Sequence, residues 1–310
     1  MKNSNIKNKG LSQLAKGKLV FYILGLSIFV VQFLVYYVYA NFSSITLAFQ
    51  KLVLIDGNSK YVFNGFENFK EIFTDFSQPN TQSYIFRGIL IFIMNMPTLF
   101  IASFFSYYIA RRFPAGKLFQ VMLYIPGIIS GLVFTSMYKY FMCDCVPAIW
   151  KSFTGETILP LIDPSNTVST FICTWLYSFI LSFGGGVLYI TSSMASISQS
   201  VVEAVKIEGA KPFKEFTSIY FPLSWQIISI SFITSFAGFL TADVGLFTFF
   251  GTGAPEEIWT LGYYMSLITV NSTQADYPYI AALGLLISAI TIPVTLGSRR
   301  VSDKISKRWE

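Results

Sequence analysis

The sequence predicts an all-α membrane protein with six transmembrane helices, and three observations support this fold class. First, only 12% of the 310 residues are charged, whereas soluble globular domains carry about 25%. Second, 53% of the residues are hydrophobic and the mean hydropathy is +0.56. Third, apolar stretches without Lys, Arg, Asp or Glu recur along the chain, and each has the roughly 20 residues that cross a bilayer.

The predicted spans are continuous in hydrophobicity rather than alternating, which excludes a closed β-barrel. The first of them is too long, and too poor in a small-residue cleavage site, for a secretory signal peptide. The six spans cover residues 19–40, 88–110, 118–138, 168–194, 223–242 and 279–297.

The distribution of Lys and Arg predicts which loops face the cytoplasm. With the N-terminus in the cytoplasm, 16 of the 22 basic residues fall in cytoplasmic segments, while the outer segments hold 11 of the 16 acidic residues. Both termini are therefore predicted to be cytoplasmic. The chain divides into a basic tail (1–18), a membrane domain (19–298) that contains a cytoplasmic loop (200–222), and a second tail (299–310).

Two spans contain residues that modify a regular helix. Pro126, together with Gly127 and Gly131, is expected to bend the third span. In the fourth span, the glycine run 184–186 predicts close packing against another helix, with a flexible point as the alternative.

The cytoplasmic loop is a charge-balanced segment between two apolar spans. Its first residues fit a capping box, in which the Ser200 hydroxyl and the Glu203 carboxylate each accept from the other residue's backbone N–H. The helix that starts there is expected to run about two turns to Glu208, and Gly209 supplies the left-handed residue that ends many helices. The small residues Ala204, Gly209 and Ala210 allow close approach by another surface.

A second helix is predicted from Pro212, which suits the first turn because its missing N–H has no intrahelical partner there. In this helix Phe213, Phe216 and Ile219–Tyr220 share one face. Lys211 and Glu215 are expected to pair four residues apart, and Pro222 to mark the break before the fifth span. Because a two-turn helix is not stable alone, the loop must dock on its own bundle, as an interfacial connector, or on a partner.

A specific pattern of residues favours a partner. The pattern consists of Glu203, Ala204, Gly209, Ile219 and Pro222. With these residues the segment resembles the EAA loop in permease subunits of binding-protein-dependent ABC importers, which runs Glu-Ala-Ala, three residues, Gly, nine residues, Ile, one residue, Leu-Pro. Val205 and Phe221 depart from the pattern but stay apolar. Weaker matches at 41–50, 65–73, 123–130, 249–255 and 276–290 are similar to the carbohydrate, maltose-type branch, so the resemblance covers roughly residues 20–300.

The resemblance implies a role in a bacterial cell membrane. In the family, two homologous permease subunits form the translocation path, two ATP-binding subunits lie beneath them, and an extracellular or lipid-anchored binding protein delivers the solute. By carry-over, the loop is a coupling-helix loop: residues 200–210 sit in a cleft on the ATPase, and helix 212–220 acts as a lever. The implied ATPase-coupling residues are Ser200, Glu203, Ala204, Glu208, Gly209, Ala210, Phe216, Ile219 and Pro222.

The chain itself lacks the residues that catalysis usually needs. No Gly-x-x-x-x-Gly-Lys-Ser/Thr motif for ATP binding occurs, and histidine is absent, which removes His bases and most zinc or haem sites. Cys143, Cys145 and Cys173 form no disulfide framework. We therefore expect no catalytic residue, metal or cofactor. Nucleic acid is not expected as a partner, because the net charge of +6 follows the membrane topology.

Aromatic rings supply the candidate substrate contacts, because they can stack on the faces of a sugar. Position in an interfacial aromatic belt is the alternative for most of them. The rings are Tyr138, Trp175, Tyr177, Tyr263 and Tyr264.

Polar groups within the spans are few: Gln32, Asn95 and scattered Ser and Thr. Asp243 is the one acidic residue embedded in an apolar run. Such a group is functional if it is buried at membrane depth, and simply solvated if it lies at the interface. Aromatic and uncharged polar groups favour a neutral saccharide.

Two other functions are alternatives to import by an ABC system. An ion-coupled secondary transporter of a small polar solute usually needs embedded carboxylates or two related halves, whereas only Asp243 qualifies and no repeat is evident. An intramembrane enzyme would need clustered carboxylates, a His or a Cys–base pair.

Overall fold

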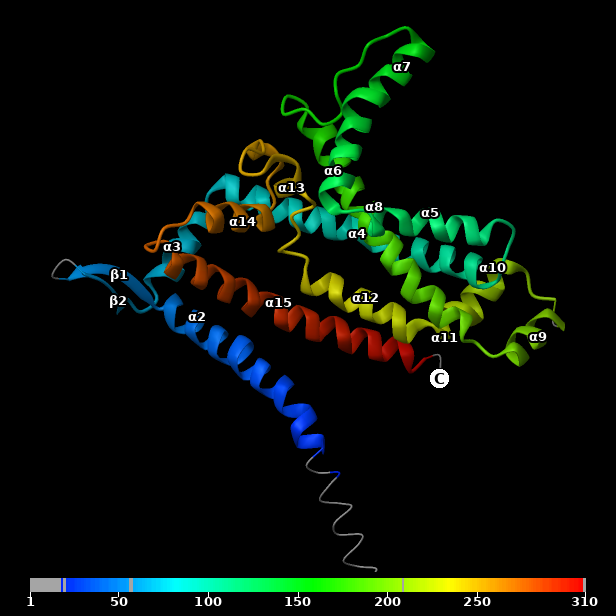
Figure 1. Cartoon of the computed structure of the whole chain (residues 1–310), viewed down its shortest axis with the longest axis horizontal. Helices are drawn as coiled ribbons and strands as arrows, with labels where there is room; N and C mark the ends of the chain where they lie inside the picture. Colours follow the sequence, from blue (N-terminus) through cyan, green and yellow to red (C-terminus); the bar gives the residue numbers. More distant parts are fainter. Residues whose placement is uncertain (1–17, 19–20, 56–57, 208, 309–310) are drawn as a thin grey trace, which may run out of the picture. The chain divides into compact units, whose positions relative to one another are not determined.

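A computed structural model describes residues 18, 21–55, 58–207 and 209–308 (Figure 1). They form two compact units. The first unit comprises the chain up to Ile72 together with Thr273–Leu285. The second comprises Phe73–Ser272 together with the chain from Leu286 onward.

Four helices are long and apolar enough to cross a membrane: Phe21–Ala48, Pro79–Ala110, Thr167–Ala195 and Tyr277–Ser306. Two further candidates are bent helix pairs. Gly116–Ile128 meets Gly131–Thr154 at 107°, and Pro212–Leu223 meets Trp225–Ala237 at 74°. The described residues therefore hold four to six candidate spans, as expected of a mostly helical, multi-pass membrane protein.

The first unit contains a β-hairpin, so the all-α prediction is wrong here. The long first helix continues past its predicted end at residue 40, through the π-helical turn η1 (Leu34–Tyr39) and α2 (Ala40–Ala48). Strand β1 (Gln50–Ile55) then pairs antiparallel with β2 (Asn58–Phe63), in a register that runs from Gln50 opposite Phe63 to Ile55 opposite Asn58.

Helix α3 (Glu67–Phe76) is joined to this hairpin by a buried amide. The Asn68 Nδ2 atom donates to the carbonyls of Ala48 (2.7 Å) and Gln50 (2.8 Å). One side chain therefore satisfies two backbone acceptors where α2 passes into β1, which is how buried polar groups are stabilised.

Helices α4 (Pro79–Ala110) and α8 (Thr167–Ala195) pack together in the second unit. The Ser106 hydroxyl of α4 lies 3.2 Å from the Val187 carbonyl of α8. Helix α8 matches the predicted fourth span to within one residue at each end, whereas α4 begins nine residues before its predicted span.

Helix α5 (Gly116–Ile128) crosses α8 at Gly184. A Cβ atom at Gly184 would lie 2.2 Å from the Leu123 carbonyl oxygen, whereas one at Gly185 or Gly186 would meet nothing within 4 Å. The predicted close packing of the glycine run is therefore confirmed for Gly184.

The third predicted span is broken between α5 and α6 (Gly131–Tyr140), at Ile129 and Ser130. This confirms the bend expected near Pro126. The chain continues through the π-helical turn η2 (Phe141–Cys145) and α7 (Val146–Thr154), and its three cysteines are free thiols.

Helix α12 (Trp225–Ala237) is shorter than the predicted fifth span, 223–242. Its 13 residues rise about 20 Å, less than the ~30 Å of a hydrocarbon core. A turn-rich segment then leads to α13 (Leu246–Phe250), the 3₁₀ turn η4 (Glu256–Ile258) and α14 (Leu261–Asn271).

The last helix, α15 (Tyr277–Ser306), continues past its predicted end at residue 297 into the predicted tail. Within the second unit, the Trp225 indole at the start of α12 donates to the Ser302 carbonyl at 3.2 Å. This contact fixes the end of α15 against the start of α12.

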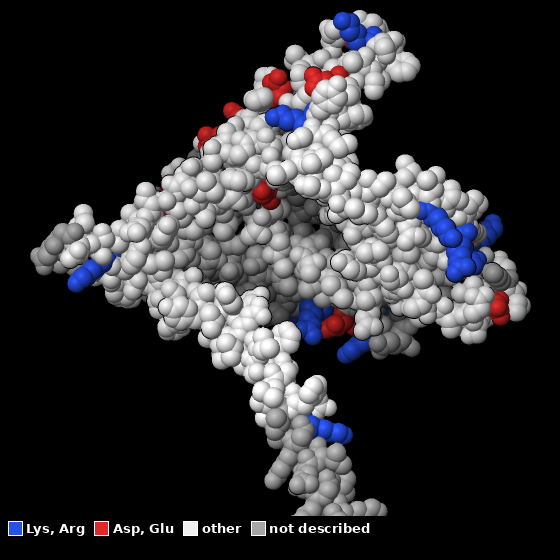
Figure 2. Space-filling model, in the orientation of Figure 1, with Lys and Arg blue, Asp and Glu red and all other residues white. Residues whose placement is uncertain are grey.

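Residues 196–224, here called the α8–α12 connection, form two short helices. The first is α9 (Gln199–Ile207). The second, called the second connection helix, runs over residues 212–223 as α10 (Pro212–Glu215), the π-helical turn η3 (Phe216–Tyr220) and α11 (Phe221–Leu223). Figure 2 shows a mostly uncharged face, with Lys and Arg gathered at the end of the second unit where α5, α9 and α10 lie.

Candidate functional site

Helix α9 begins two residues earlier than the predicted capping box requires. Gln199 is its first residue, and the Ser198 carbonyl accepts from the Val201 and Val202 backbone N–H groups. The Ser200 hydroxyl lies 3.1 Å from the Ser198 hydroxyl, and Glu203 accepts from the Gln199 side chain at 3.2 Å. The predicted Ser200–Glu203 box is therefore wrong, because Ser200 is already inside the first turn.

The end of α9 agrees with the prediction. Gly209 has φ +66°, the left-handed conformation that glycine adopts without steric cost. The Ala210 N–H donates to the Val205 carbonyl at 3.4 Å, the long bond that closes a Schellman motif. Glu208 lies outside the described residues.

The two faces of α9 have different surroundings. Val202 is buried in a hydrophobic core with residues of α4, α8 and α12, and Val205 is buried as well. Glu203 and Ala204 are exposed, and Ile207 is 86% exposed. The buried face holds α9 on the bundle, and the exposed face leaves an apolar side chain in contact with solvent, available to another surface.

The second connection helix begins at Pro212 as predicted, with Lys211 extended before it. The predicted pair of Lys211 with Glu215 is wrong. Glu215 is 4% exposed, and its carboxylate binds Arg111, at the end of α4, with Nε–Oε1 at 2.8 Å and an Nη2–Oε2 hydrogen bond of 3.2 Å. Burial lowers the pKa of Arg111, but the Glu215 carboxylate together with the Tyr107 and Tyr220 side chains raises the pKa above its ordinary value.

Phe216 is the central side chain of the core beneath this helix. It is fully buried, and its ring centroid lies 5.5 Å from those of Phe100 and Tyr107 and 5.6 Å from that of Phe104, all on α4. Tyr220 packs on Tyr107 at 5.0 Å.

Other residues of the predicted apolar face differ in burial. Phe213 does not join the face, because it is 62% exposed. Ile219 and Pro222 are half-buried, and the helix breaks at Ser224, two residues after Pro222.

Two of the candidate substrate contacts lie inside the protein. Tyr138 and Tyr177 are 6% and 4% exposed, with ring centroids 5.4 Å apart. The Tyr138 hydroxyl donates to the Cys173 carbonyl at 2.8 Å, and the Tyr177 hydroxyl bonds Thr135 at 2.6 Å. Both hydroxyls are therefore occupied within the protein in this conformation.

The segment that follows α12 contains Asp243 and lies close to Trp175. Trp175 packs on a core that contains Val244 and Leu246. Asp243 is half-buried, and its Oδ1 atom is buried without a hydrogen-bond partner in the described part of the chain. Tyr263, also buried, donates to the Gly251 carbonyl at 2.9 Å.

A groove of about 450 Å³ runs between α4, α8 and α12. Its lining combines uncharged polar groups with aromatic rings and the side-chain-free edge of α8 at Gly185 and Gly186. Trp175 reaches it indirectly, because its Nε1 donates to Asn95 at 3.0 Å. The polar lining residues are Asn95, Thr98, Ser182, Ser231, Thr234 and Ser235, and the aromatic ones are Phe179, Phe183 and Tyr189.

Sequence reasoning missed most of this groove. Ser231, Thr234 and Ser235 recur at positions i, i+3 and i+4 of an otherwise apolar stretch, the spacing that places side chains on one helix face. This spacing is the sequence signal for a polar helix face. It was missed because the Ser and Thr residues within the spans were regarded as scattered. No three His, Cys, Asp or Glu side chains of the described residues gather to hold a metal ion.

Comparison with known proteins identifies the chain's relatives, although no family model matches it. The chain is 25% identical over 196 residues to the multiple sugar-binding transport system permease protein MsmF of Streptococcus mutans, a match that covers 62% of this chain and 64% of that protein. It is 25% identical over 235 residues to the lactose transport system permease protein LacF of Rhizobium radiobacter, covering 73% and 76%.

A third relative extends the match. The arabinooligosaccharides transport system permease protein AraP of Bacillus subtilis is 24% identical over 294 residues, covering 88% of this chain and 86% of that protein. In fold, the chain matches a crystal structure of a bacterial ABC transporter involved in the import of the acidic polysaccharide alginate. The TM-score is 0.75 at 17% identity, covering 96% of this chain and 99% of that chain.

The predicted family resemblance is confirmed. The chain has the fold of an ABC transporter chain over nearly its whole length and is similar in sequence to permease proteins of sugar transport systems. The match with MsmF spans less than two thirds of that permease, whereas the match with AraP spans 86% of that protein.

Proposed function

We propose that this chain is the permease subunit of a binding-protein-dependent ABC importer, with six spans and both termini in the cytoplasm of a bacterial cell. It forms the translocation path for a sugar or oligosaccharide together with a second, homologous permease. Two ATP-binding subunits drive transport, and an extracellular or lipid-anchored binding protein delivers the solute.

The main support for this proposal is the structure of the α8–α12 connection. Helix α9 buries Val202 and Val205, Val202 within the core that includes α4 and α8, ends at a left-handed Gly209, and exposes Ala204 and Ile207. A short helix that is packed on the bundle through one face, and carries an exposed apolar side chain on the other, suits a segment bound by a partner. We assign this exposed face to the ATP-binding subunit.

The second connection helix links that face to the spans. Phe216 packs on α4, and Glu215 binds Arg111 at the end of α4. A displacement of α9 would therefore move α4 and α12 together, because a packed core transmits strain rather than absorbing it.

The names of the relatives and the lining of the groove support a saccharide as the solute. MsmF, LacF and AraP are each named for sugar transport. The groove offers amide and hydroxyl groups beside Phe179 and Tyr189, and sugars bind through hydroxyl hydrogen bonds and through stacking on rings. We propose this groove as part of the path.

Copurification tests the proposal, with a matched pair of glycine variants. Gly209 and Gly155 both have positive φ and open space around the missing Cβ, so valine imposes similar local strain at either position. Gly209→Val is expected to lose the copurifying ATP-binding subunit while the chain still inserts into the membrane. Gly155→Val, in the predicted outer loop, should retain it, and equal retention by both variants would contradict the proposal.

One observation favours the alternative, an ion-coupled secondary transporter: the buried Asp243 Oδ1 atom without a partner among the described residues. That function predicts that the purified chain, alone in vesicles, moves a polar solute down an imposed proton or sodium gradient. The importer predicts no transport without ATP and the other subunits.

A further inference from the structure

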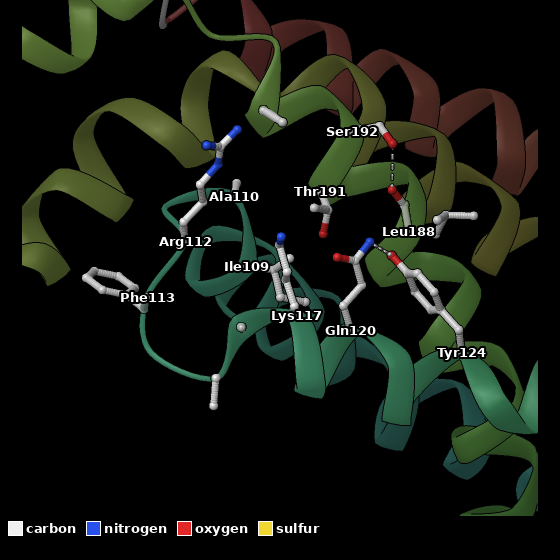
Figure 3. Close-up of a pocket in the computed structure, with 13 residues that line it drawn as sticks. Ile109, Ala110, Arg112, Phe113, Lys117, Gln120, Tyr124, Leu188, Thr191 and Ser192 are labelled. Atoms are coloured by element: carbon white, nitrogen blue, oxygen red, sulfur yellow. Dashed lines mark hydrogen bonds between the residues drawn. The ribbon is translucent and has the colours of Figure 1, made fainter.

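A second cavity lies where α4 ends and α5 begins, beside the last turns of α8 (Figure 3). Its volume is about 570 Å³. Ile109, Phe113 and Leu188 give it apolar walls, while Arg112, Lys117 and Thr191 contribute polar atoms. The positive-inside distribution predicts that this end of the helices faces the cytoplasm.

The charge of the cavity is of one sign. Arg112 and Lys117 are its only charged lining residues, and neither forms an ion pair with any side chain that the structure describes. The neighbouring Arg111 is different, because Glu215 neutralises it at 2.8 Å. Two cations without a carboxylate, in a cavity rather than on an open surface, favour a bound anion.

Thr191 adds a hydroxyl that has no partner. Its side chain is 9% exposed, and its Oγ1 atom is buried without a hydrogen bond in the described part of the chain. The next residue shows the usual arrangement, since the Ser192 hydroxyl donates to the Leu188 carbonyl at 3.0 Å. A buried hydroxyl without a partner is costly, and Figure 3 shows Thr191 directed into the cavity, toward Lys117 and Gln120.

The N-terminus of α5 faces the same space. Ala115 is the N-cap residue, has φ +60°, and provides no side-chain hydrogen bond to the first turn. Ala115, Gly116 and Lys117 all line the cavity. The N-terminus of a helix carries unsatisfied N–H groups and a partial positive charge, which stabilise an anion.

We propose that this cavity binds a phosphate group. Lys117, Arg112 and the first turn of α5 supply the positive charge, and Thr191 donates a hydrogen bond to a phosphate oxygen. The group can come from an anionic phospholipid of the cytoplasmic leaflet, whose acyl chains would follow the apolar walls, or from a soluble phosphate ester. The inference does not rest on the proposed transport function.

The test uses the full-length chain in nanodiscs of neutral phosphatidylcholine, into which phosphatidylglycerol is titrated while bound lipid is counted by native mass spectrometry. Lys117→Gln and Arg112→Gln are each expected to weaken binding about tenfold or more, because each removes a charged hydrogen-bond donor. Thr191→Val, nearly equal in shape, should weaken binding several-fold. Lys214→Gln, an exposed lysine outside the cavity, should leave binding unchanged.

A second probe distinguishes the source of the phosphate. Glycerol 1-phosphate, added to nanodiscs of phosphatidylcholine alone, binds with the same dependence on Lys117 if the ligand is soluble. It neither binds nor competes if the ligand is a lipid. The proposal is overturned if neither probe binds, or if Lys117→Gln and Thr191→Val bind both probes as tightly as Lys214→Gln. Unchanged melting temperatures in phosphatidylcholine show that the variants remain folded.

Discussion

Glu215 shows how a distant partner replaces the local one that the sequence suggests. Spacing along an isolated helix favours Lys211, four residues before Glu215. In the fold, Glu215 lies on the buried face of the second connection helix, beside Phe216, and the end of α4 brings Arg111 to it. The sequence contains no signal for that contact, because the two residues are 104 positions apart.

Removing one member of this pair is expected to destabilise the protein strongly. Glu215→Ala leaves a partly buried guanidinium without its carboxylate, at a cost of about 3–5 kcal/mol. Glu203→Ala, on an exposed residue, should cost less than about 0.5 kcal/mol. Thermal unfolding in detergent measures both, and Arg111→Met with Glu215→Leu should recover most of the loss. Equal melting temperatures for Glu215→Ala and Glu203→Ala would show that the pair contributes nothing.

Neighbouring glycines of α8 supply a second residue-scale prediction. A Cβ at Gly184 would overlap the Leu123 carbonyl oxygen, whereas one at Gly185 meets open space. Gly184→Ala is therefore expected to cost about 1–3 kcal/mol by overpacking, while Gly185→Ala should be neutral or slightly stabilising. Close packing could be predicted from the glycine run, but which glycine faces α5 depends on the crossing of the two helices. A neutral Gly184→Ala would mean that α5 and α8 are farther apart.

At the scale of elements, apolar runs located the membrane helices well and their ends poorly. Helix α8 matches its predicted span, but α15 continues through Arg299 and Arg300 to Ser306, because an apolar run marks only the apolar part of a helix and the helix can continue into polar residues. The hairpin of β1 and β2 was missed, although Asp56-Gly57 between the strands is a common two-residue turn sequence.

The two faces of α9 should respond differently to the same substitution. Val205→Ser puts a hydroxyl into the core and is expected to cost about 1–3 kcal/mol of stability. Ile207→Ser changes an exposed side chain, so stability should stay within about 0.5 kcal/mol, while copurification of the ATP-binding subunit should fall. Melting temperature and subunit stoichiometry, measured on the same preparations, separate the effects. Unchanged stoichiometry for Ile207→Ser would remove the exposed face of α9 from the interface.

At the scale of the whole second unit, one hydrophobic core joins the α8–α12 connection to the helices that line the groove. That core contains Val202 of α9, Phe216 and Tyr220 of the second connection helix, and Ile190 of α8. The family and the position of the loop could be predicted from the EAA pattern. The groove could not be predicted, because it forms only where three helices come together. The rings of Tyr138 and Tyr177, which were two of the predicted substrate contacts, are buried elsewhere.

Blocking the groove should stop transport without dissociating the complex. Ser231→Trp fills a lining position of α12, whereas Ser229→Trp adds the same bulk two residues away, outside the lining. We expect the first variant to abolish uptake of radiolabelled saccharides into proteoliposomes of the assembled transporter and the second to retain most of it. Equal uptake by both variants would place the path elsewhere.

Site-specific photo-crosslinking tests most directly the central claim, that a separate ATP-binding subunit contacts the exposed face of α9. A benzoylphenylalanine at Ala204 or Ile207 is predicted to crosslink to the ATP-binding subunit in membranes. The same probe at Phe153, which is 86% exposed on α7, should not. Absence of the crosslink from both α9 positions, or an equal yield from position 153, would contradict the coupling role of this segment.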